Sequence, residues 1–268
     1  MDVRHPIYPP TMTAMGAKDD VLPKSFAWAC DTGGTLTPSQ RTRISRAIRG
    51  GYRAVVEGLV TWPIHRSPYG ADFPTAPDST LAKTAEEEAK EQGPALERHG
   101  YRTWLLGAAL ADHDGVRIEP ELFYITSLLH DAGIVRSVTG EDFTVRSGGI
   151  LLRVCLSAGM SEDLGIRAAD AAVAHATPGL TATDDPVAFY VQAGAMADLA
   201  GLRMWDLPRR HMRRAYAAYP GAGVHFEVPR MIRREAEHVP EGRFAMLKRA
   251  GMDFMVTVSP TRLFDLHW

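Results

Sequence analysis

The run "FYITSLLHDAGIV", from Phe123 to Val135, is mostly apolar but contains a histidine beside an aspartate, His130 and Asp131. A carboxylate that is buried without a partner is costly, so such a group is normally paired, hydrogen-bonded or bound to a metal ion. Imidazole and carboxylate are both ligands of divalent metals, and histidine also transfers protons near neutral pH. The doublet therefore predicts a buried site in which Asp131 has a partner.

Three further residues with suitable side chains lie in mostly apolar surroundings: His99 in "ERHGYRTW", His175 in "AVAHATPG" and Asp198 in "GAMADLAG". For any one buried histidine, a structural hydrogen bond is commoner than metal ligation. Several such positions together favour a metal site. A second His-Asp pair, His113 and Asp114 in "ADHDGV", has the glycine and acidic neighbours of an exposed loop, so the first doublet is the better candidate.

Helices must position these residues, because apolar residues recur at helical spacing through most of the chain and no series of strands with period two is present. The expected helices cover residues 37–62, 81–115 with a break near Gly93-Pro94, 120–133, 145–159, 161–179, 184–202, 207–220 and 240–255. Gly133 stands where a helix commonly ends, so His130 and Asp131 are expected in a final turn. Neighbours on a helix differ in direction by about 100°, so both reach one ion only near a helix end or kink. The sequence predicts an all-α fold.

Two segments are expected along the chain. Residues 1–36 are rich in Pro, Gly and Asp and predict an extended or loosely packed N-terminal arm. Residues 37–268 form a single helical domain, which begins with Thr37 as N-cap and Pro38 at the first helical position. The stretch "DTGGTLT", from Asp31, is similar to the nucleophile loop of haloacid dehalogenase-type phosphatases. Since the parallel sheet of those enzymes is not expected here, its glycines are assigned to a turn.

The composition excludes several classes of protein. With 268 residues, 45% hydrophobic and 23% charged, the chain has the length and composition of one globular domain. Its net charge of −2 lacks the basic field of nucleic-acid binders, so no nucleic-acid partner is expected. The two cysteines, Cys30 and Cys155, are too few for a disulfide scaffold. The stretch "MDVRHPIYPP" lacks the apolar core of a signal peptide. No apolar run reaches the roughly 18 residues of a membrane helix. We expect a cytoplasmic protein with a small-molecule substrate, no membrane partner and, as the ordinary assembly, a homodimer.

Four segments resemble, in the same order, those of the HD superfamily of metal-dependent hydrolases, which is named for its His-Asp doublet. They are "HGYRTWLLGAAL" from His99, "LLHDAGI" at the doublet, "AVAHATPGL" at His175 and "VQAGAMADLAG" at Asp198. They are most similar to the cyanamide hydratase-like branch, whose Tyr-Pro stretch resembles "AYPGAGVHFE". The resemblance covers about residues 80–240 and implies that these form the core of an HD-domain helical bundle.

The resemblance also implies a ligand set and a reaction. His99, His130, Asp131 and Asp198 would bind one divalent metal ion, with Zn favoured over Fe or Mn. An open site lowers the pKa of a bound water, so metal-bound hydroxide would attack a small molecule in nitrile hydration or C–N bond hydrolysis. His175 would transfer a proton, orient the substrate or act as a further ligand.

Arg102 completes the expected catalytic set. It lies three residues after His99 and so projects from roughly the same helix face. Its guanidinium would either anchor a substrate carboxylate or phosphate, or orient Asp131 or Asp198. Together with Asp131 and His175, it is predicted to carry the chemistry.

Two positions depart from the hydratase branch and leave the substrate open: Gly100 replaces a serine, and Thr144 stands at an acidic position. Three alternatives follow. A nucleotide or phosphoester phosphohydrolase would hold phosphate with Arg102 or with the arginines of residues 209–214. A di-iron oxygenase would need additional ligands. A catalytically silent HD fold would bind a ligand or partner without turnover.

Overall fold

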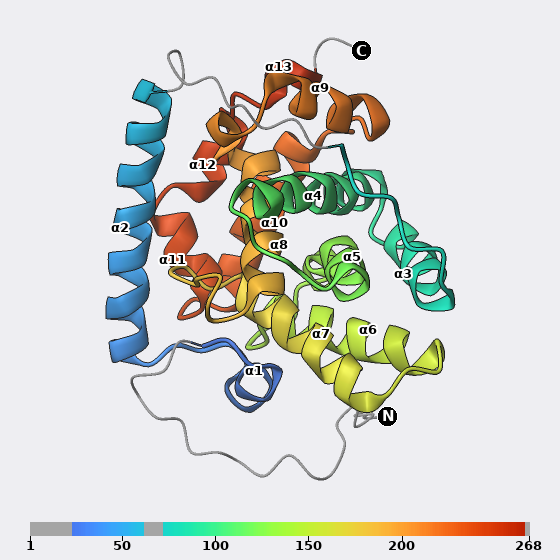
Figure 1. Ribbon diagram of the computed structural model, residues 1–268. Coiled ribbons are helices and arrows are strands. Elements are labelled where there is room, and N and C mark those ends of the chain that lie inside the picture. The colour runs from blue at the N-terminus through green and yellow to red at the C-terminus, as the bar shows by residue number, and fades with distance from the viewer. Residues whose placement is uncertain (1–22, 62–71, 266–268) are drawn as a thin grey trace.

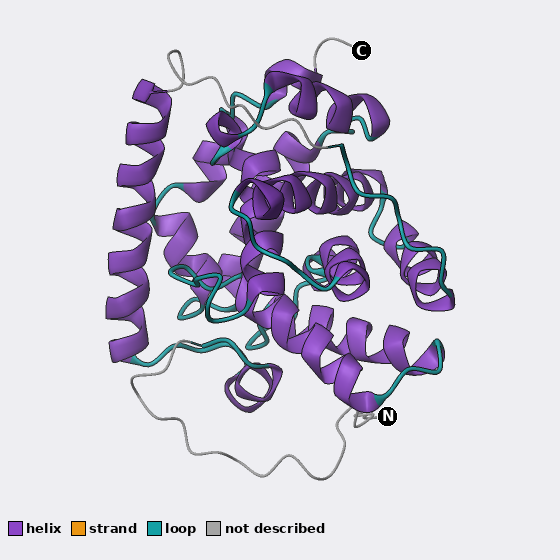
Figure 2. Cartoon of the chain, in the orientation of Figure 1, coloured by secondary structure: helices purple, strands orange, loops and turns teal. Residues whose placement is uncertain are grey.

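The computed structural model describes residues 23–61 and 72–265. In these ranges the chain contains no named strand, only an isolated antiparallel bridge between Val138 and Glu141 (Figure 2). The predicted all-α fold is therefore confirmed. No helix within these ranges combines the length and the apolar character needed to span a membrane.

The helices follow one another in this order: α1 (Phe26–Thr32), α2 (Pro38–Thr61), α3 (Thr80–Lys90), α4 (Pro94–His113), α5 (Pro120–Leu129), η1 (Ala132–Val135), α6 (Phe143–Ser157), α7 (Glu162–His175), α8 (Pro186–Ala200), η2 (Met204–Asp206), α9 (Arg209–Ala218), α10 (Val224–His238), α11 (Arg243–Arg249), α12 (Met252–Thr257) and α13 (Arg262–Asp265).

Helix α5 lies in the centre of the bundle (Figure 1). It contacts α3, α4, α6, α7 and α8, and its residues from Leu122 to Leu129 are all buried. The apolar run of the sequence is thus a helix that is covered on every side. Because α5 ends inside the protein, the doublet that follows it is also placed in the interior.

Local capping signals define several helix boundaries as the sequence predicts. Thr37 Oγ1 accepts a hydrogen bond from Gln40 N at 3.3 Å, and Gln40 Oε1 accepts one from Thr37 N at 3.0 Å, immediately before α2 begins at Pro38. Gly93 separates α3 from α4 with a φ of 81°, a left-handed conformation that favours glycine, and Pro94 is the first residue of α4.

Helices α4 and α8 cross at glycine positions. A Cβ atom on Gly107 would lie 2.4 Å from the carbonyl oxygen of Tyr190, and one on Gly194 would lie 2.2 Å from that of Thr103. No real Cβ atom tolerates such distances, so only glycine lets the two backbones approach this closely. The crossing holds the first histidine of the predicted site, on α4, next to the last aspartate, on α8.

We expect Gly194→Ala to lower the free energy of unfolding by about 1–3 kcal/mol, because the added methyl group forces the helices apart. Gly149→Ala is the matched control, since a Cβ atom at this position of α6 would meet nothing within 4 Å. At this position, alanine should raise the free energy of unfolding by about 0.5–1 kcal/mol, because alanine has a higher helix propensity than glycine. Urea unfolding of both variants measures the difference, and equal effects would show that the crossing is not tight.

The prediction of an extended or loosely packed arm is wrong for residues 23–36, the described part of this segment. Residues 1–22 lie outside the described ranges. Helix α1 occupies part of this segment, and its Phe26 and Ala29 are buried against α6 and α7. Ser25 caps it by accepting from Trp28 N at 3.2 Å. A helix of 7 residues is too short for a 3.6-residue period to stand out, which explains the error.

Helix α10, which runs through Pro229, is not among the helices expected from the sequence. Its buried Val224, Val228 and Ile232 are spaced four residues apart, a helical pattern that the proline and the preceding glycines obscure. The omission matters because α10 forms part of the wall beside the predicted site.

Candidate metal centre

The His-Asp doublet lies at a helix end, as its sequence predicts. His130 follows the last residue of α5, and Asp131 precedes η1. Helix α4 brings His99 to this point, because a Cβ atom on the next residue, Gly100, would lie only 2.9 Å from the Cα atom of Leu128. The glycine at the position where the hydratase branch has serine thus permits α4 to approach the end of α5.

Three imidazole rings surround the carboxylate of Asp131. His99 Nε2 and His130 Nε2 lie 3.7 and 3.4 Å from Asp131 Oδ2, and His175 Nε2 lies 3.5 Å from Asp131 Oδ1. One ligand atom from each of His99, His130 and Asp131 lies within 4.8 Å of the others. All four residues are buried. His175, at the end of α7, thus adds a third imidazole to the doublet and His99.

Backbone carbonyls fix the orientation of two of these rings. His130 Nδ1 lies 2.8 Å from Ser127 O, and His175 Nδ1 lies 2.5 Å from Ala172 O. A carbonyl oxygen only accepts hydrogen bonds, so each Nδ1 must carry the hydrogen. In the neutral rings, the lone pair is therefore on Nε2, which faces Asp131.

The orientation of His99 depends on Asp198. His99 Nδ1 lies 2.7 Å from Asp198 Oδ2, while His99 Nε2 faces Asp131 on the opposite side of the ring. Asp198 is consequently separated from the other predicted ligands by the imidazole. Asp198 lies outside the group of His99, His130 and Asp131, whose ligand atoms lie together, and its role as a metal ligand stays a prediction. In this structure its carboxylate orients His99, an arrangement common for metal-binding histidines.

Arg102 explains why Asp198 turns away from the centre. Its Nε and Nη2 atoms donate to Asp198 Oδ1 and Oδ2 at 2.6 and 2.9 Å, and its Nη1 donates to the carbonyl oxygens of Tyr219 and Pro220. The guanidinium is fully buried and does not line the cavity described below. Of the two roles expected for Arg102, these contacts match the orientation of Asp198 rather than the anchoring of a substrate, because its donors serve Asp198 and the chain after α9.

Charge and burial shift the pKa values of the residues in the cluster in different directions. Burial would lower the pKa of His130, but the adjacent charge of Asp131 raises that pKa above its usual value. Burial lowers the pKa of His99 and of His175, which favours their neutral forms. For Asp131, burial would raise the pKa, but the charge of His130 holds it well below its usual range. The carboxylate is thus ionised beside His130, whose protonated form is favoured, and beside His99 and His175, whose neutral forms are favoured.

Two buried nitrogens of this cluster have no hydrogen-bond partner among the described residues: His99 Nε2 and His130 Nε2. Such orphaned polar atoms are rare in native proteins and call for an explanation. Two unpaired imidazole nitrogens beside an ionised carboxylate fit a borderline divalent cation such as Zn²⁺ or Fe²⁺, and the binding of such an ion would release the proton that His130 favours. The buried group of His99, His130 and Asp131 could hold such an ion, with His175 next to it.

The cluster forms one end of a cavity of about 220 Å³. His130, Asp131 and His175 line this cavity together with Gln192, and most of the remaining lining is apolar. Gln192 is not among the site residues expected from the sequence. Its position six residues before Asp198, as a polar residue in the same mostly apolar helix, could have indicated it. A ligand in the cavity would therefore contact the same carboxylate and imidazoles as the cation.

Asp198→Asn tests the role of the second aspartate. If Asp198 only orients His99, the variant should still bind metal, with an affinity about 10–100-fold lower, because the amide oxygen keeps the hydrogen bond and loses the charge. Chelator competition measures the affinity, and circular dichroism checks the fold. Complete loss of the metal from a folded variant would return Asp198 to the ligand set.

Comparisons with known proteins do not assign a family to this chain. A scan against protein-family models and a search of curated proteins both give no match for the chain.

Proposed function

We propose that the protein is a metal-dependent hydrolase or hydratase that adds water to a small molecule, by nitrile hydration or C–N bond hydrolysis. One observation carries the proposal: His99, His130 and His175 direct Nε2 atoms at the single carboxylate of Asp131, in the wall of a cavity. The resemblance of the doublet and its neighbouring segments to the HD superfamily is consistent with this chemistry.

His99, His130 and Asp131 would hold the ion, and His175 is the fourth residue within reach. A divalent ion in such a site supplies a water of lowered pKa and polarises the substrate. Asp198 and Arg102 act behind His99 and keep its Nε2 directed at the centre. This division of roles matches an open catalytic site rather than a closed structural one.

His175 is the residue that moves protons in this proposal. Its Nδ1 hydrogen bonds to Ala172 O, and burial keeps the ring neutral, so Nε2 can accept a proton from the attacking water. As the water oxygen bonds to the substrate carbon, His175 then returns that proton to the substrate nitrogen. In hydration the nitrogen stays attached; in hydrolysis the C–N bond breaks and the nitrogen leaves protonated.

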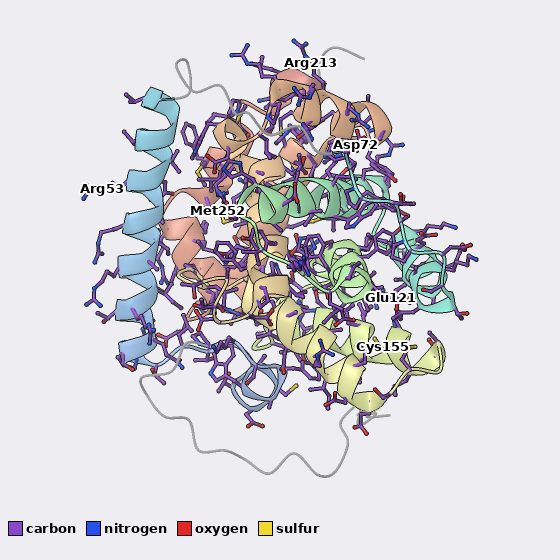
Figure 3. All side chains as sticks on the ribbon, viewed as in Figure 1. Arg53, Asp72, Glu121, Cys155, Arg213 and Met252 are labelled. Carbon is purple, nitrogen blue, oxygen red and sulfur yellow. The ribbon has the colours of Figure 1, made fainter. Side chains whose placement is uncertain are left out.

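Phosphoester hydrolysis has less support, because Arg102 is committed to Asp198 and the exposed arginines of α9 do not line the cavity. Figure 3 shows Arg213 at the outer surface of α9, away from the interior side chains. A di-iron centre would need more ligands than the single group that the described residues supply.

Elemental analysis of the purified protein, followed by a screen of nitriles, amides and nucleotides, tests the proposal. We expect one divalent ion per chain and release of amide or ammonia from the first two classes. Two irons per chain would favour oxygenation, and a folded protein that neither carries nor takes up metal would favour a silent scaffold.

A further inference from the structure

The cavity beside Asp131 is divided into a polar end and an apolar wall. Its polar end is formed by His130, Asp131, His175 and Gln192. The wall includes Ile134, Leu199, Val228, Ile232, Phe244 and Met252, contributed by η1, α8, α10, α11 and α12. Met252, labelled in Figure 3, lies among the interior side chains on the side of the bundle that α2 covers. A molecule in this cavity would have one end at the cluster and its remainder against hydrocarbon.

Helix α2 lines one side of the cavity, mainly with apolar residues. Ala47, Ile48 and Val55 line it, while Arg49 lines an adjoining hollow and Arg53 points away from the bundle in Figure 3. The described lining of the cavity contains no lysine and no arginine. The lining therefore offers a phosphate group none of the lysine or arginine side chains that usually hold it.

The volume of the cavity, about 220 Å³, sets the scale of its occupant. Apolar cavities of about 150 Å³ bind benzene. A molecule somewhat larger than benzene, such as a six-carbon chain or one substituted ring, would fill the present cavity.

Gln192 adds a hydrogen-bonding preference at the polar end. Its Nε2 donates to the carbonyl oxygens of His175 and Thr177, at 2.5 and 3.0 Å, which fixes the amide group. The Oε1 atom is then the acceptor that Gln192 can offer to the cavity. An acceptor at this place is complementary to an N–H group on the polar end of a ligand.

We propose that the substrate is an uncharged, predominantly apolar molecule whose reacting group, at one end, carries an N–H donor. This inference rests on the proposed function, because it assigns the reacting group to the cluster of Asp131 and the three histidines. It also explains why a centre with polar chemistry opens onto side chains of leucine, valine, isoleucine and methionine.

Primary amides of increasing length test this substrate class: acetamide, butanamide and hexanamide, with adenosine monophosphate as the charged comparison. Calorimetric titration of the purified protein, as isolated, measures the dissociation constants, and ammonia release is assayed separately. We expect the dissociation constant to fall roughly fourfold for each added methylene. Adenosine monophosphate should not displace hexanamide. Hexanenitrile, which has the same chain without an N–H group, should bind about fivefold more weakly than hexanamide.

The two methionines Met255 and Met246 provide a matched pair of variants. Met255 lines the cavity, whereas Met246 lines only the adjoining hollow, and both are partly exposed. Met255→Gln should weaken the binding of hexanamide about fivefold, because the alkyl chain of the ligand would cover a polar amide. The binding of acetamide should be unchanged. Met246→Gln should change neither. Unchanged hexanamide binding in a folded Met255→Gln variant would overturn the proposal.

The binding and turnover results separate the two proposals. Affinity that rises with chain length, without release of ammonia or hydration of the nitrile, supports the apolar substrate site and contradicts the proposed reaction. Ammonia release with affinities that do not depend on chain length overturns the apolar site and leaves the reaction in place. Tighter binding of adenosine monophosphate than of hexanamide also overturns the apolar site.

Discussion

We expect His130→Ala to abolish both the proposed metal binding and the proposed activity of the protein. His130 supplies one of the two buried, orphaned Nε2 atoms at the centre, and alanine offers no ligand in its place. Loss of a residue that merely orients a ligand costs about 10–100-fold in metal affinity, so loss of a ligand should cost at least about 100-fold. A matching fall in kcat/KM corresponds to about 2.7 kcal/mol of transition-state stabilisation.

His113→Ala is the matched control, because His113 also precedes an aspartate but ends α4 at a partly exposed position. It should leave metal content and activity unchanged. Plasma emission spectroscopy gives the metal-to-protein ratio, and the amide assay gives the rate. Should His130→Ala retain one tightly bound ion per chain, the assignment of the centre to the buried doublet would be wrong.

Arg102→Met should cause the largest loss of stability, about 3–5 kcal/mol in the free energy of unfolding. Arg102 and Asp198 are both fully buried and make two hydrogen bonds with each other. Burial would raise the pKa of Asp198, but the charge of Arg102 and the hydrogen bond from His99 hold it far below its usual range. Removing the guanidinium leaves a carboxylate that is buried and deprived of its cation.

A double variant separates the loss of the pair from the loss of packing. Arg102→Met combined with Asp198→Asn removes both charges and keeps an acceptor for His99, so it should recover a large part of the lost stability. Urea unfolding measures all three variants. If the double variant is as unstable as the sum of the single ones, the pair does not contribute as a unit.

Arg167→Met is the control for Arg102→Met. Arg167 Nη2 and Glu119 Oε2 lie 2.7 Å apart, but their side chains are 52% and 44% exposed. Exposed ion pairs contribute about 0–1 kcal/mol, so this variant should change the free energy of unfolding by no more than that. A similar loss in both arginine variants would contradict the importance given to burial.

Several features of this protein follow from its sequence because they depend on neighbours along the chain. The period of apolar residues predicts the helices, and local capping by Thr37 and Gly93 defines where two of them begin. The doublet at the end of an apolar run predicts a buried site with two adjacent side chains near a helix end. These signals need only the geometry of one or two helical turns.

Local periodicity did not reveal α1 or α10. The first has too few residues for a period to show, and the second contains Pro229, which normally ends a helix. Packing decides both cases. Phe26 is buried against α6 and α7, and Val228 and Ile232 are buried beside the cavity. The gain from covering these apolar side chains outweighs the weak or contrary local signal.

The sequence alone predicted buried positions within helices or at a helix end for His99, His130, Asp131, His175 and Asp198, and it suggested that they meet. Only the tertiary structure decided which atoms face one another. Nothing in the spacing of residues shows that one aspartate faces three Nε2 atoms while the other pairs with an arginine. That choice depends on the crossing of α4 and α8 at two glycines, which brings Asp198 to Arg102 and to the far side of the His99 ring. Such packing sets the distances between helices that are far apart in sequence, and these distances cannot be predicted from patterns of neighbouring residues.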